Sequence, residues 1–272
     1  MRDAAHDPPR LEDNPRFGAG QNHHWRNTFD IPPLRIYIDH ESDIGRSGGA
    51  VDKNVLLYWS GGKDSAMALY ELATNPRFNA FRVTDVMTTL TEGYDRISGH
   101  GVRSVLLDRQ ADCLGLTLHR TYIPQQSSMS EYEYVIEEAL RHYKDKGTLL
   151  AATGDIFLEK RRMAIFKKVG VDGCFPLMLV NAREHVMRII DLGFKAYVVA
   201  VDSAALPETF VGRLVDREFV ESLPVGVDVC GENGEFHTFV FDGPLFREPV
   251  RCRLGEVVYR ESLFFCDVLP DD

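Results

Sequence analysis

Strand-like and helix-like segments alternate along the chain between residues 55 and 201. The strand candidates are short, apolar and mostly bounded by Gly, Asp or Pro, at residues 55–59, 81–90, 117–123, 148–153 and 195–201. Helix candidates lie between them at residues 65–73, 102–114, 130–144, 159–169 and 182–192. Because strands joined through helices pair in parallel by right-handed crossovers, this pattern predicts a Rossmann-like α/β fold with a doubly wound, mostly parallel sheet. Its ligand site should lie at the carboxyl ends of the strands.

Two helix candidates carry signals at their ends. Ser130 followed by Glu133 has the spacing of a capping box, which predicts a helix start at Ser130. The segment GVRSVLLDRQADCLG, residues 101–115, has apolar residues at helical spacing and ends at Gly115, a typical helix stop.

Composition divides the chain into three parts. Residues 1–53 are rich in Pro, Asp, Asn, Arg and Gly without an apolar period, which predicts a polar extension that is largely disordered. Residues 54–203 are expected to form the nucleotide-type α/β domain. After residue 203 the sequence indicates one or two helices and then hairpin-forming β segments, so residues 204–272 are predicted to form a smaller α+β part that binds the substrate.

Charge and cysteine usage narrow the class of protein. The formal net charge of −10 argues against a protein whose main role is to grip nucleic acid. The five cysteines are scattered, with no CxxC pair and no Cys/His cluster at zinc spacing, which predicts reduced thiols in the cytoplasm and no metal-ligating set. No apolar run approaches the roughly 18 residues of a membrane span, so no membrane association is expected.

The segment SGGKDS, residues 60–65, joins the first strand candidate to the first helix candidate. Gly61 and Gly62 can adopt backbone angles closed to other residues and let a phosphate approach the main chain. Amide groups at the start of the helix then point at the anion. The alternative is a turn that needs glycine only for its geometry, which the surrounding polar residues make the weaker interpretation.

The polar residues of this segment suit a phosphate. Lys63 supplies a mobile positive charge, and the Ser60 and Ser65 hydroxyls can donate hydrogen bonds. Asp64 can cap the helix, position Lys63 or help to bind Mg²⁺ through water. The segment nevertheless does not fit the common GxxxxGK[ST] phosphate loop.

SGGKDS resembles the signature of the PP-loop, or N-type, ATP pyrophosphatases, a group of the adenine nucleotide alpha hydrolase type. In that family the loop grips the β,γ-pyrophosphate and leaves the α-phosphorus open to attack by a substrate oxygen. The resemblance implies that the chain uses ATP with Mg²⁺ and releases AMP and pyrophosphate.

Three further motifs resemble the diphthine–ammonia ligase branch of this family. They are RISGHGVR at residues 96–103, TGDI at residues 153–156 with Arg161 and Arg162 nearby, and GVDVCGENGEFHTFVFDGPLF at residues 226–246. The resemblance covers about residues 54–268. It implies amidation of a substrate carboxylate, on a small molecule or a protein side chain, with free ammonia. No Cys-His or Ser-His-Asp arrangement suggests a covalent enzyme intermediate.

Candidate site residues outside the loop lie where strand candidates end. His100 and Arg103 lie at the start of the helix candidate at residues 102–114 and can face the phosphates, although a helix cap for His100 and a surface ion pair for Arg103 are the alternatives. Asp155 follows the fourth strand candidate at the expected ligand edge, and we expect it to act in catalysis with Lys63, although a cap of the next helix is the alternative. Thr88 ends the second strand candidate and is expected near the adenine, although threonine also simply suits a β segment.

The C-terminal motif is the expected substrate site. Asn-Gly alone indicates a turn, yet the density of polar groups favours a site, and the resemblance implies substrate contact. Either glutamate of the motif can recognise a cationic group or deprotonate ammonium, and we expect Glu235 to be catalytic. The expected substrate-binding residues are Glu232, Asn233, Gly234, Glu235, His237 and Thr238.

Three other functions remain open at this point. Diphthine is restricted to the translocation elongation factor of archaea and eukaryotes, so a bacterial source would require another small carboxylate. A tRNA-modifying PP-loop enzyme is disfavoured by the charge of −10 and the missing CxxC. A nucleotide-binding regulator without turnover is the third alternative. A homodimer is expected only because two-fold symmetry is common.

Overall fold

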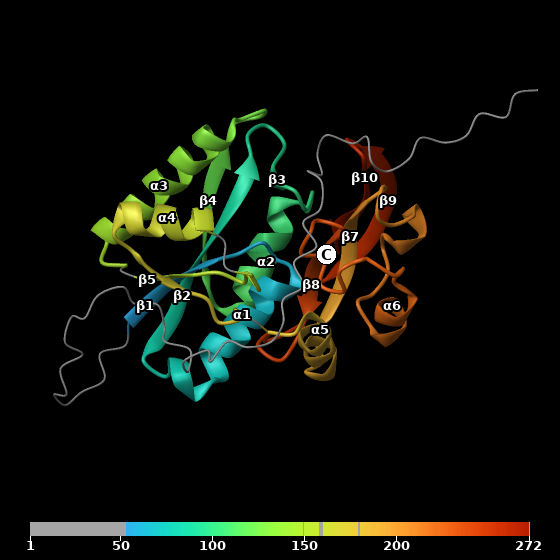
Figure 1. Cartoon of the computed structure of the whole chain (residues 1–272), viewed down its shortest axis with the longest axis horizontal. Coiled ribbons are helices and arrows are strands. Elements are labelled where there is room, and N and C mark those ends of the chain that lie inside the picture. The colour runs from blue at the N-terminus through green and yellow to red at the C-terminus, as the bar shows by residue number, and fades with distance from the viewer. Residues whose placement is uncertain (1–52, 149, 158–159, 179, 272) are drawn as a thin grey trace, which may run out of the picture. The chain divides into compact units, whose positions relative to one another are not determined.

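The computed structural model describes residues 53–148, 150–157, 160–178 and 180–271. The extension predicted to be disordered lies almost wholly outside these residues. The described residues form two β-sheets with accompanying helices (Figure 1). No described helix is long and apolar enough to cross a membrane.

The first sheet carries the predicted parallel strands. The order β2, β1, β5, β6 is parallel, β4 pairs in parallel with β2, and the short β3 pairs antiparallel with β2. The strands are β1 (Lys53–Tyr58), β2 (Phe81–Thr91), β3 (Arg96–Ile97), β4 (Thr117–Ile123), β5 (Leu150–Ala152) and β6 (Asp172–Cys174). The chain leaves β1 in one direction toward β2 and β4 and returns on its other side as β5 and β6. The doubly wound prediction is therefore confirmed, and the switch between directions lies between β1 and β5.

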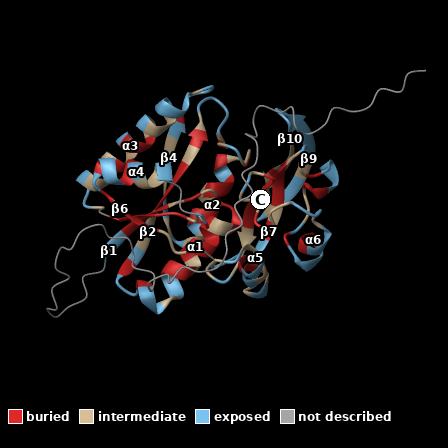
Figure 2. Cartoon of the chain, in the orientation of Figure 1, coloured by how far each residue is buried: buried red, intermediate tan, exposed pale blue. Residues whose placement is uncertain are grey.

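Helices cover both faces of this sheet. Alternate residues of the central strands point to opposite faces, and each set packs against its own helices. Leu56 packs with apolar residues of α3 and α4, whereas Leu57 belongs to the cluster that includes α1 and α2. Buried residues accordingly line the strands and the inner sides of the helices (Figure 2). The helices are α1 (Lys63–Thr74), α2 (Ser104–Leu114), α3 (Met129–Asp145), α4 (Lys160–Val169) and α5 (Ala182–Asp191).

One of the two helix-end predictions is confirmed and the other is displaced. Gly115 ends α2 with φ 69, the left-handed conformation expected at a glycine stop. The capping box of α3 is formed by Ser128 and Glu131 rather than by Ser130 and Glu133. Both pairs have the same spacing, so the local sequence does not distinguish them.

The second sheet is antiparallel and lies in the order β8, β7, β10, β9. Its strands are β7 (Lys195–Asp202), β8 (Phe236–Asp242), β9 (Cys252–Arg260) and β10 (Leu263–Pro270). The strand expected at residues 195–201 belongs to this sheet, so the expected division of the chain at residue 203 does not coincide with the division between the sheets. Two short helical segments lie between β7 and β8, one at Glu208–Phe210 and the other α6 (Arg217–Ser222). A third short segment, at Pro76–Phe78, follows α1.

Polar contacts and a shared core join the two sheets. The Val240 N–H of β8 donates to the Gly61 carbonyl at 2.9 Å, which ties the second sheet to the segment after β1. Leu57 of β1 and Phe239 of β8 belong to the same buried cluster. The second sheet is thus fixed directly against the end of β1.

Candidate active site

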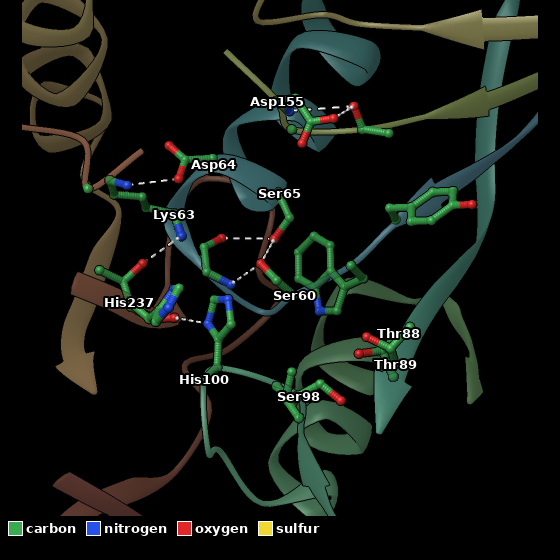
Figure 3. Close-up of a pocket in the computed structure, with 18 of the residues that line it drawn as sticks. Ser60, Lys63, Asp64, Ser65, Thr88, Thr89, Ser98, His100, Asp155 and His237 are labelled. Atoms are coloured by element: carbon green, nitrogen blue, oxygen red, sulfur yellow. Dashed lines mark hydrogen bonds and ion pairs between the residues drawn. The ribbon is translucent and has the colours of Figure 1, made fainter. Parts of the chain in front are cut away.

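A cavity of about 350 Å³ lies where β1, β2 and β5 end, and residues before and within β8 line its other side (Figure 3). This volume is within the range of small-molecule sites. Its lining includes most of residues 60–65, Thr88 and Thr89, residues 153–155, and most of residues 230–238. The predicted ligand edge of the sheet and the predicted substrate motif therefore face the same space.

The SGGKDS segment forms a tight loop that ends at the start of α1. Gly61 has φ 74, and a side chain there would place its Cβ 2.8 Å from Gln110 Oε1, so glycine is required. Ser60 Oγ accepts from the Gly62 N–H at 3.2 Å, and the Ser65 hydroxyl donates to the Gly62 carbonyl at 2.9 Å. The start of α1 leaves amide groups and a partial positive charge beside the cavity, as an anion site needs.

Gln110 of α2 fixes this loop from behind and was not predicted from the sequence. The residue is fully buried, and its Oε1 accepts from Trp59 Nε1 at 2.9 Å. Its Nε2 donates to the Gly61 carbonyl at 3.0 Å and to the Val240 carbonyl at 2.5 Å. One amide therefore joins the end of β1, the loop and β8, although the glutamine alone gives no signal of this role in the sequence.

Lys63 is buried at the first position of α1, and its ammonium group is held on two sides. Nζ donates to Asp64 Oδ2 at 2.8 Å and to the Cys230 carbonyl, and lies 5.3 Å from the centroid of the Phe236 ring. Burial acts to lower the pKa of Lys63, but the adjacent Asp64 carboxylate outweighs it and raises that pKa. Lys63 is therefore a cation on the wall of the cavity, held in place by these contacts rather than mobile as the sequence suggested.

Asp64 is held by a second buried residue that sequence reasoning missed. His185 Nε2 lies 3.1 Å from Asp64 Oδ1, and His185 is 4% exposed. Burial acts to raise the pKa of Asp64, and the charges and hydrogen bonds of Lys63 and His185 reverse that effect and lower it. Asp64 therefore stays ionised and orients Lys63.

His100 lines the cavity, and its ring is neutral. Its ring centroid lies 4.5 Å from that of His237, and its Nδ1 lies 3.2 Å from the Thr238 carbonyl. Burial, with the neighbouring His237, lowers the pKa of His100 to about 3. Burial and Lys63 lower the pKa of His237 to about 4. The carbonyl can only accept, so His100 Nδ1 carries the proton and Nε2 is an acceptor.

Arg103 lies outside the cavity lining, which favours the surface ion pair that was the alternative for this residue. Its Nε and Nη2 donate to Asp267 Oδ1 at 3.1 Å and Oδ2 at 2.6 Å. Arg96 also contacts Asp267, at 2.9 Å. These two arginines join the start of α2 and β3 to β10, so Arg103 has a structural partner in place of a phosphate.

Asp155 lines the cavity after β5, at the predicted ligand edge. Its Oδ2 accepts from Thr153 Oγ1 at 2.8 Å and lies 2.8 Å from Arg162 Nε. A Cβ on Gly154 would lie 2.7 Å from the backbone carbon of Asp64, so only glycine allows this turn to approach α1 so closely. The glycine thereby brings the carboxylates of Asp64 and Asp155 to one cavity.

Two buried hydroxyl groups on the cavity wall have no hydrogen-bond partner among the described residues. They are Thr88 Oγ1, on a residue that is 2% exposed, and Tyr58 OH. Leaving a buried hydroxyl unpaired costs about 1–3 kcal/mol, so both groups indicate a polar ligand. Thr88 was predicted near the adenine, whereas Tyr58 ends an apolar strand and had no distinguishing signal.

Glu235 holds the loop before β8 and does not line the cavity. Its carboxylate accepts from the Asp228 N–H at 3.0 Å, the Asn233 N–H at 3.0 Å and Asn233 Nδ2 at 2.9 Å. Burial acts to raise the pKa of Glu235, and these hydrogen bonds lower it. The geometry thus assigns Glu235 and Asn233 to the fold of the loop, which makes Glu235 a poor candidate for the catalytic base. Gly234, with φ 89, and His237 do line the cavity.

Two residues of this motif interact with the loop at residues 60–65, Glu232 through its charge and Thr238 through a hydrogen bond. Glu232 lines the cavity, and burial together with the Asp64 carboxylate raises its pKa to about 7. Thr238 Oγ1 accepts from the Lys63 N–H at 3.0 Å. Thr238 therefore holds the start of α1, and Glu232 is a carboxyl group that titrates near neutral pH.

The acidic residues of the cavity suit a cation bound through phosphate and water. The described residues hold no group of three His, Cys, Asp or Glu that could bind a metal by themselves. Asp64, Asp155 and Glu232 nevertheless line the same cavity as Lys63. Mg²⁺ binds typically through one or two carboxylates, waters and substrate phosphates, so this donor set fits Mg²⁺ together with a nucleotide.

The parallel sheet, the loop at its switch point and the cavity define a PP-loop nucleotide-binding protein. The sequence profile of the diphthamide synthase N-terminal domain matches residues 53–172, and that of the diphthamide synthase C-terminal domain matches residues 181–269. The chain belongs to this diphthamide synthase family.

Curated relatives carry one enzyme name. Diphthine–ammonia ligase of Homo sapiens is 25% identical over 197 residues, covering 65% of this chain and 74% of the human protein. The Danio rerio protein of the same name is 24% identical over 230 residues, covering 77% of this chain and 90% of its own length. That of Schizosaccharomyces pombe is 24% identical over 236 residues, which is 78% of this chain and 38% of the yeast protein.

Solved structures resemble the chain more distantly. A predicted subunit of tRNA methyltransferase from Methanocaldococcus jannaschii aligns with a TM-score of 0.38 and 16% identity, covering 69% of this chain and 96% of the other. The U34-tRNA thiolase NcsA from Methanococcus maripaludis aligns with a TM-score of 0.36 and 16% identity, covering 54% and 60%.

Proposed function

We propose that the protein is an ATP-dependent carboxylate–ammonia ligase that releases AMP and pyrophosphate. The observation that carries this proposal is that the phosphate loop and the C-terminal motif line one cavity and are hydrogen-bonded to each other. The name shared by the curated relatives supports diphthine as the carboxylate substrate and ATP and ammonia as co-substrates.

The first step is attack of a substrate carboxylate oxygen on the α-phosphorus of ATP. The bond between the α-phosphorus and the bridging oxygen breaks, and pyrophosphate leaves with that oxygen. Lys63 and the amide groups at the start of α1 stabilise the departing charge, and Thr238 and Gln110 hold the loop in place for it. Mg²⁺, when bound, would neutralise phosphate oxygens beside Asp64 and Asp155.

The second step is attack of ammonia on the carbonyl carbon of the acyl-adenylate. A carbon–nitrogen bond forms, AMP leaves with its oxygen, and the nitrogen loses a proton. Glu232 supports this step better than Glu235, because it lines the cavity and its pKa of about 7 lets it accept a proton near neutral pH. His100 Nε2, on the same wall, can accept a hydrogen bond from the ammonia but does not take its proton, because burial holds the pKa of His100 at about 3.

The direct test is product analysis with a diphthine-bearing acceptor protein. We expect ATP, Mg²⁺ and ammonium to yield AMP, pyrophosphate and an acceptor whose mass fits replacement of a carboxyl OH by NH₂. Production of ADP would contradict the proposed reaction, and so would an unchanged acceptor. AMP formation with small carboxylates but not with the diphthine protein would retain the chemistry and reassign the substrate.

Matched variants link this reaction to the cavity. Lys63→Ala should abolish AMP formation, whereas Lys53→Ala, at the start of β1, should leave it unchanged.

The cysteines support a cytoplasmic location. All five are free, and burial raises the pKa of each thiol, which keeps the thiols unreactive. Free thiols of this kind are typical of proteins in the reducing cytoplasm.

A further inference from the structure

Strand β9 forms one edge of the second sheet. It pairs with β10 on one side, and no described strand pairs with its other side. Every residue from Glu256 to Arg260 is exposed, including Val257 at 40%, Val258 at 38% and Tyr259 at 59% (Figure 2). This edge therefore presents free backbone groups together with apolar side chains, which is a template for pairing with another strand.

The hairpin between β9 and β10 determines which backbone groups point outward. Glu261 and Ser262 have φ 50 and 70, as in a two-residue type I′ turn. Arg260 pairs with Leu263 next to this turn, so its N–H and C=O face β10. Because the direction alternates along the strand, Val258 also faces β10, whereas Val257 and Tyr259 present their N–H and C=O to the outside.

We propose that β9 pairs with β9 of a second copy of this chain, antiparallel, with Val258 on the two-fold axis. In this register Val257 of each copy is opposite Tyr259 of the other, and both residues have outward-facing backbone groups. Glu256 is opposite Arg260 twice, once on each side of the axis. The two sheets would then join into one continuous sheet, and the interface is isologous, as two-fold symmetry requires.

The charges single out this register from its neighbours. An axis between two residues would oppose an outward-facing residue to an inward-facing one and break the hydrogen-bond ladder. An axis at Val257 would place Glu256 opposite Val258, and an axis at Tyr259 would place Arg260 opposite Val258. Of these three axes, only the one at Val258 places two opposite charges of β9 itself opposite each other, and neither Glu256 nor Arg260 has an ion pair with a described residue that could compete.

The chemistry of this strand favours a second copy over an unrelated partner. Charged residues on an edge strand normally prevent pairing. Here the two charges are opposite in sign and equally spaced from Val258, so the strand complements itself when it is reversed. The short paired segment predicts a weak dimer whose population rises with protein concentration.

A charge-exchange series on the full chain tests the register, with sedimentation velocity over a concentration series as the measurement. Glu256→Arg alone and Arg260→Glu alone each place like charges opposite, and each should raise the dimer dissociation constant about tenfold or more. The double variant restores opposite pairs and should return to within about threefold of the wild type. Glu221→Arg, on the exposed side of α6, controls for net charge and should not change dimerisation.

A cysteine at the axis provides an independent test that detects even a weak dimer. In this register the two residues 258 form a non-hydrogen-bonded pair with Cα atoms about 4.5 Å apart, which is within disulfide range. Val258→Cys should therefore cross-link under mild oxidation, and Val257→Cys should not, because its partner is Tyr259. A wild-type protein that stays monomeric at all concentrations would overturn the proposal. Equal cross-linking of the two cysteine variants would do the same, and so would a double charge variant that fails to recover.

Discussion

Replacing Gln110 by leucine should destabilise the protein and loosen the phosphate loop. The substitution removes three buried hydrogen bonds, to Trp59 Nε1 and to the Gly61 and Val240 carbonyls. Trp59 Nε1 and the Val240 carbonyl are left unpaired, whereas the Gly61 carbonyl still accepts from the Val240 N–H. About 1.5 kcal/mol for each of the two unpaired groups gives about 3 kcal/mol. The buried leucine side chain returns about 1.5 kcal/mol. We therefore expect the free energy of unfolding to fall by about 1.5 kcal/mol.

Urea unfolding followed by circular dichroism measures this change. Gln125→Leu is the matched control, because among the described residues the Gln125 side chain makes one hydrogen bond, to the Glu92 carbonyl at 3.0 Å, and that bond is exposed. The control should lose less than about 0.5 kcal/mol. ATP binding by Gln110→Leu should weaken under conditions where the variant is still folded, since Gly61 loses one of its supports. If Gln110→Leu is no less stable than Gln125→Leu, the assignment of Gln110 as the residue that fixes the loop is refuted.

Three further predictions concern the cavity and its supports. Glu232 is ionised only above its pKa of about 7, so the rate of amide formation should fall below about pH 7, and Glu232→Gln should lower the rate roughly 100-fold and remove this pH dependence. Lys63→Ala should weaken pyrophosphate binding about tenfold or more in calorimetry, because a charge-assisted contact is lost. The pKa of Asp267 is lowered because the hydrogen bonds of Arg103 and Arg96 outweigh its burial, so this carboxylate stabilises the fold above its ordinary pKa of 3.8 and loses that effect in acid. Asp267→Asn should therefore cost about 2 kcal/mol at pH 7, and the difference in unfolding free energy should shrink in acid.

The fold of the first sheet was predictable because its signals are local. Strand β1 is mainly an apolar run, β2 and β4 are rich in β-branched residues, and α2 ends at Gly115 as expected. Strand β7 has the same apolar pattern, yet it lies in the other sheet. Its partners, β8 and β10, follow it by tens of residues, and a pattern within one strand does not specify distant partners. Strand β6, at three residues, is too short to have a detectable period.

The candidate site was predictable where chemistry and position coincide, and not where side-chain direction decides. Lys63 and Asp155 follow strand ends, and both line the cavity. Glu235 and Arg103 belong to the right motifs, but Glu235 binds its own loop and Arg103 binds Asp267. Spacing in the sequence could not show either orientation. His185 comes from a helix more than 100 residues away from Asp64 and has no motif around it.

Lys63 connects the phosphate loop to the substrate motif through two separate groups. Its backbone N–H is bound by Thr238, and its ammonium group is bound by the Cys230 carbonyl as well as by Asp64. An ammonium group has three donors, and Asp64 and the Cys230 carbonyl accept two of them, so one donor remains for a departing pyrophosphate. Asp64 is in turn held by His185. The side chain placed to bind the pyrophosphate is therefore also bound to the loop that bears Glu232. This shared contact gives a physical reason for a motif at residues 230–238 to pack against a loop some 170 residues earlier in the chain.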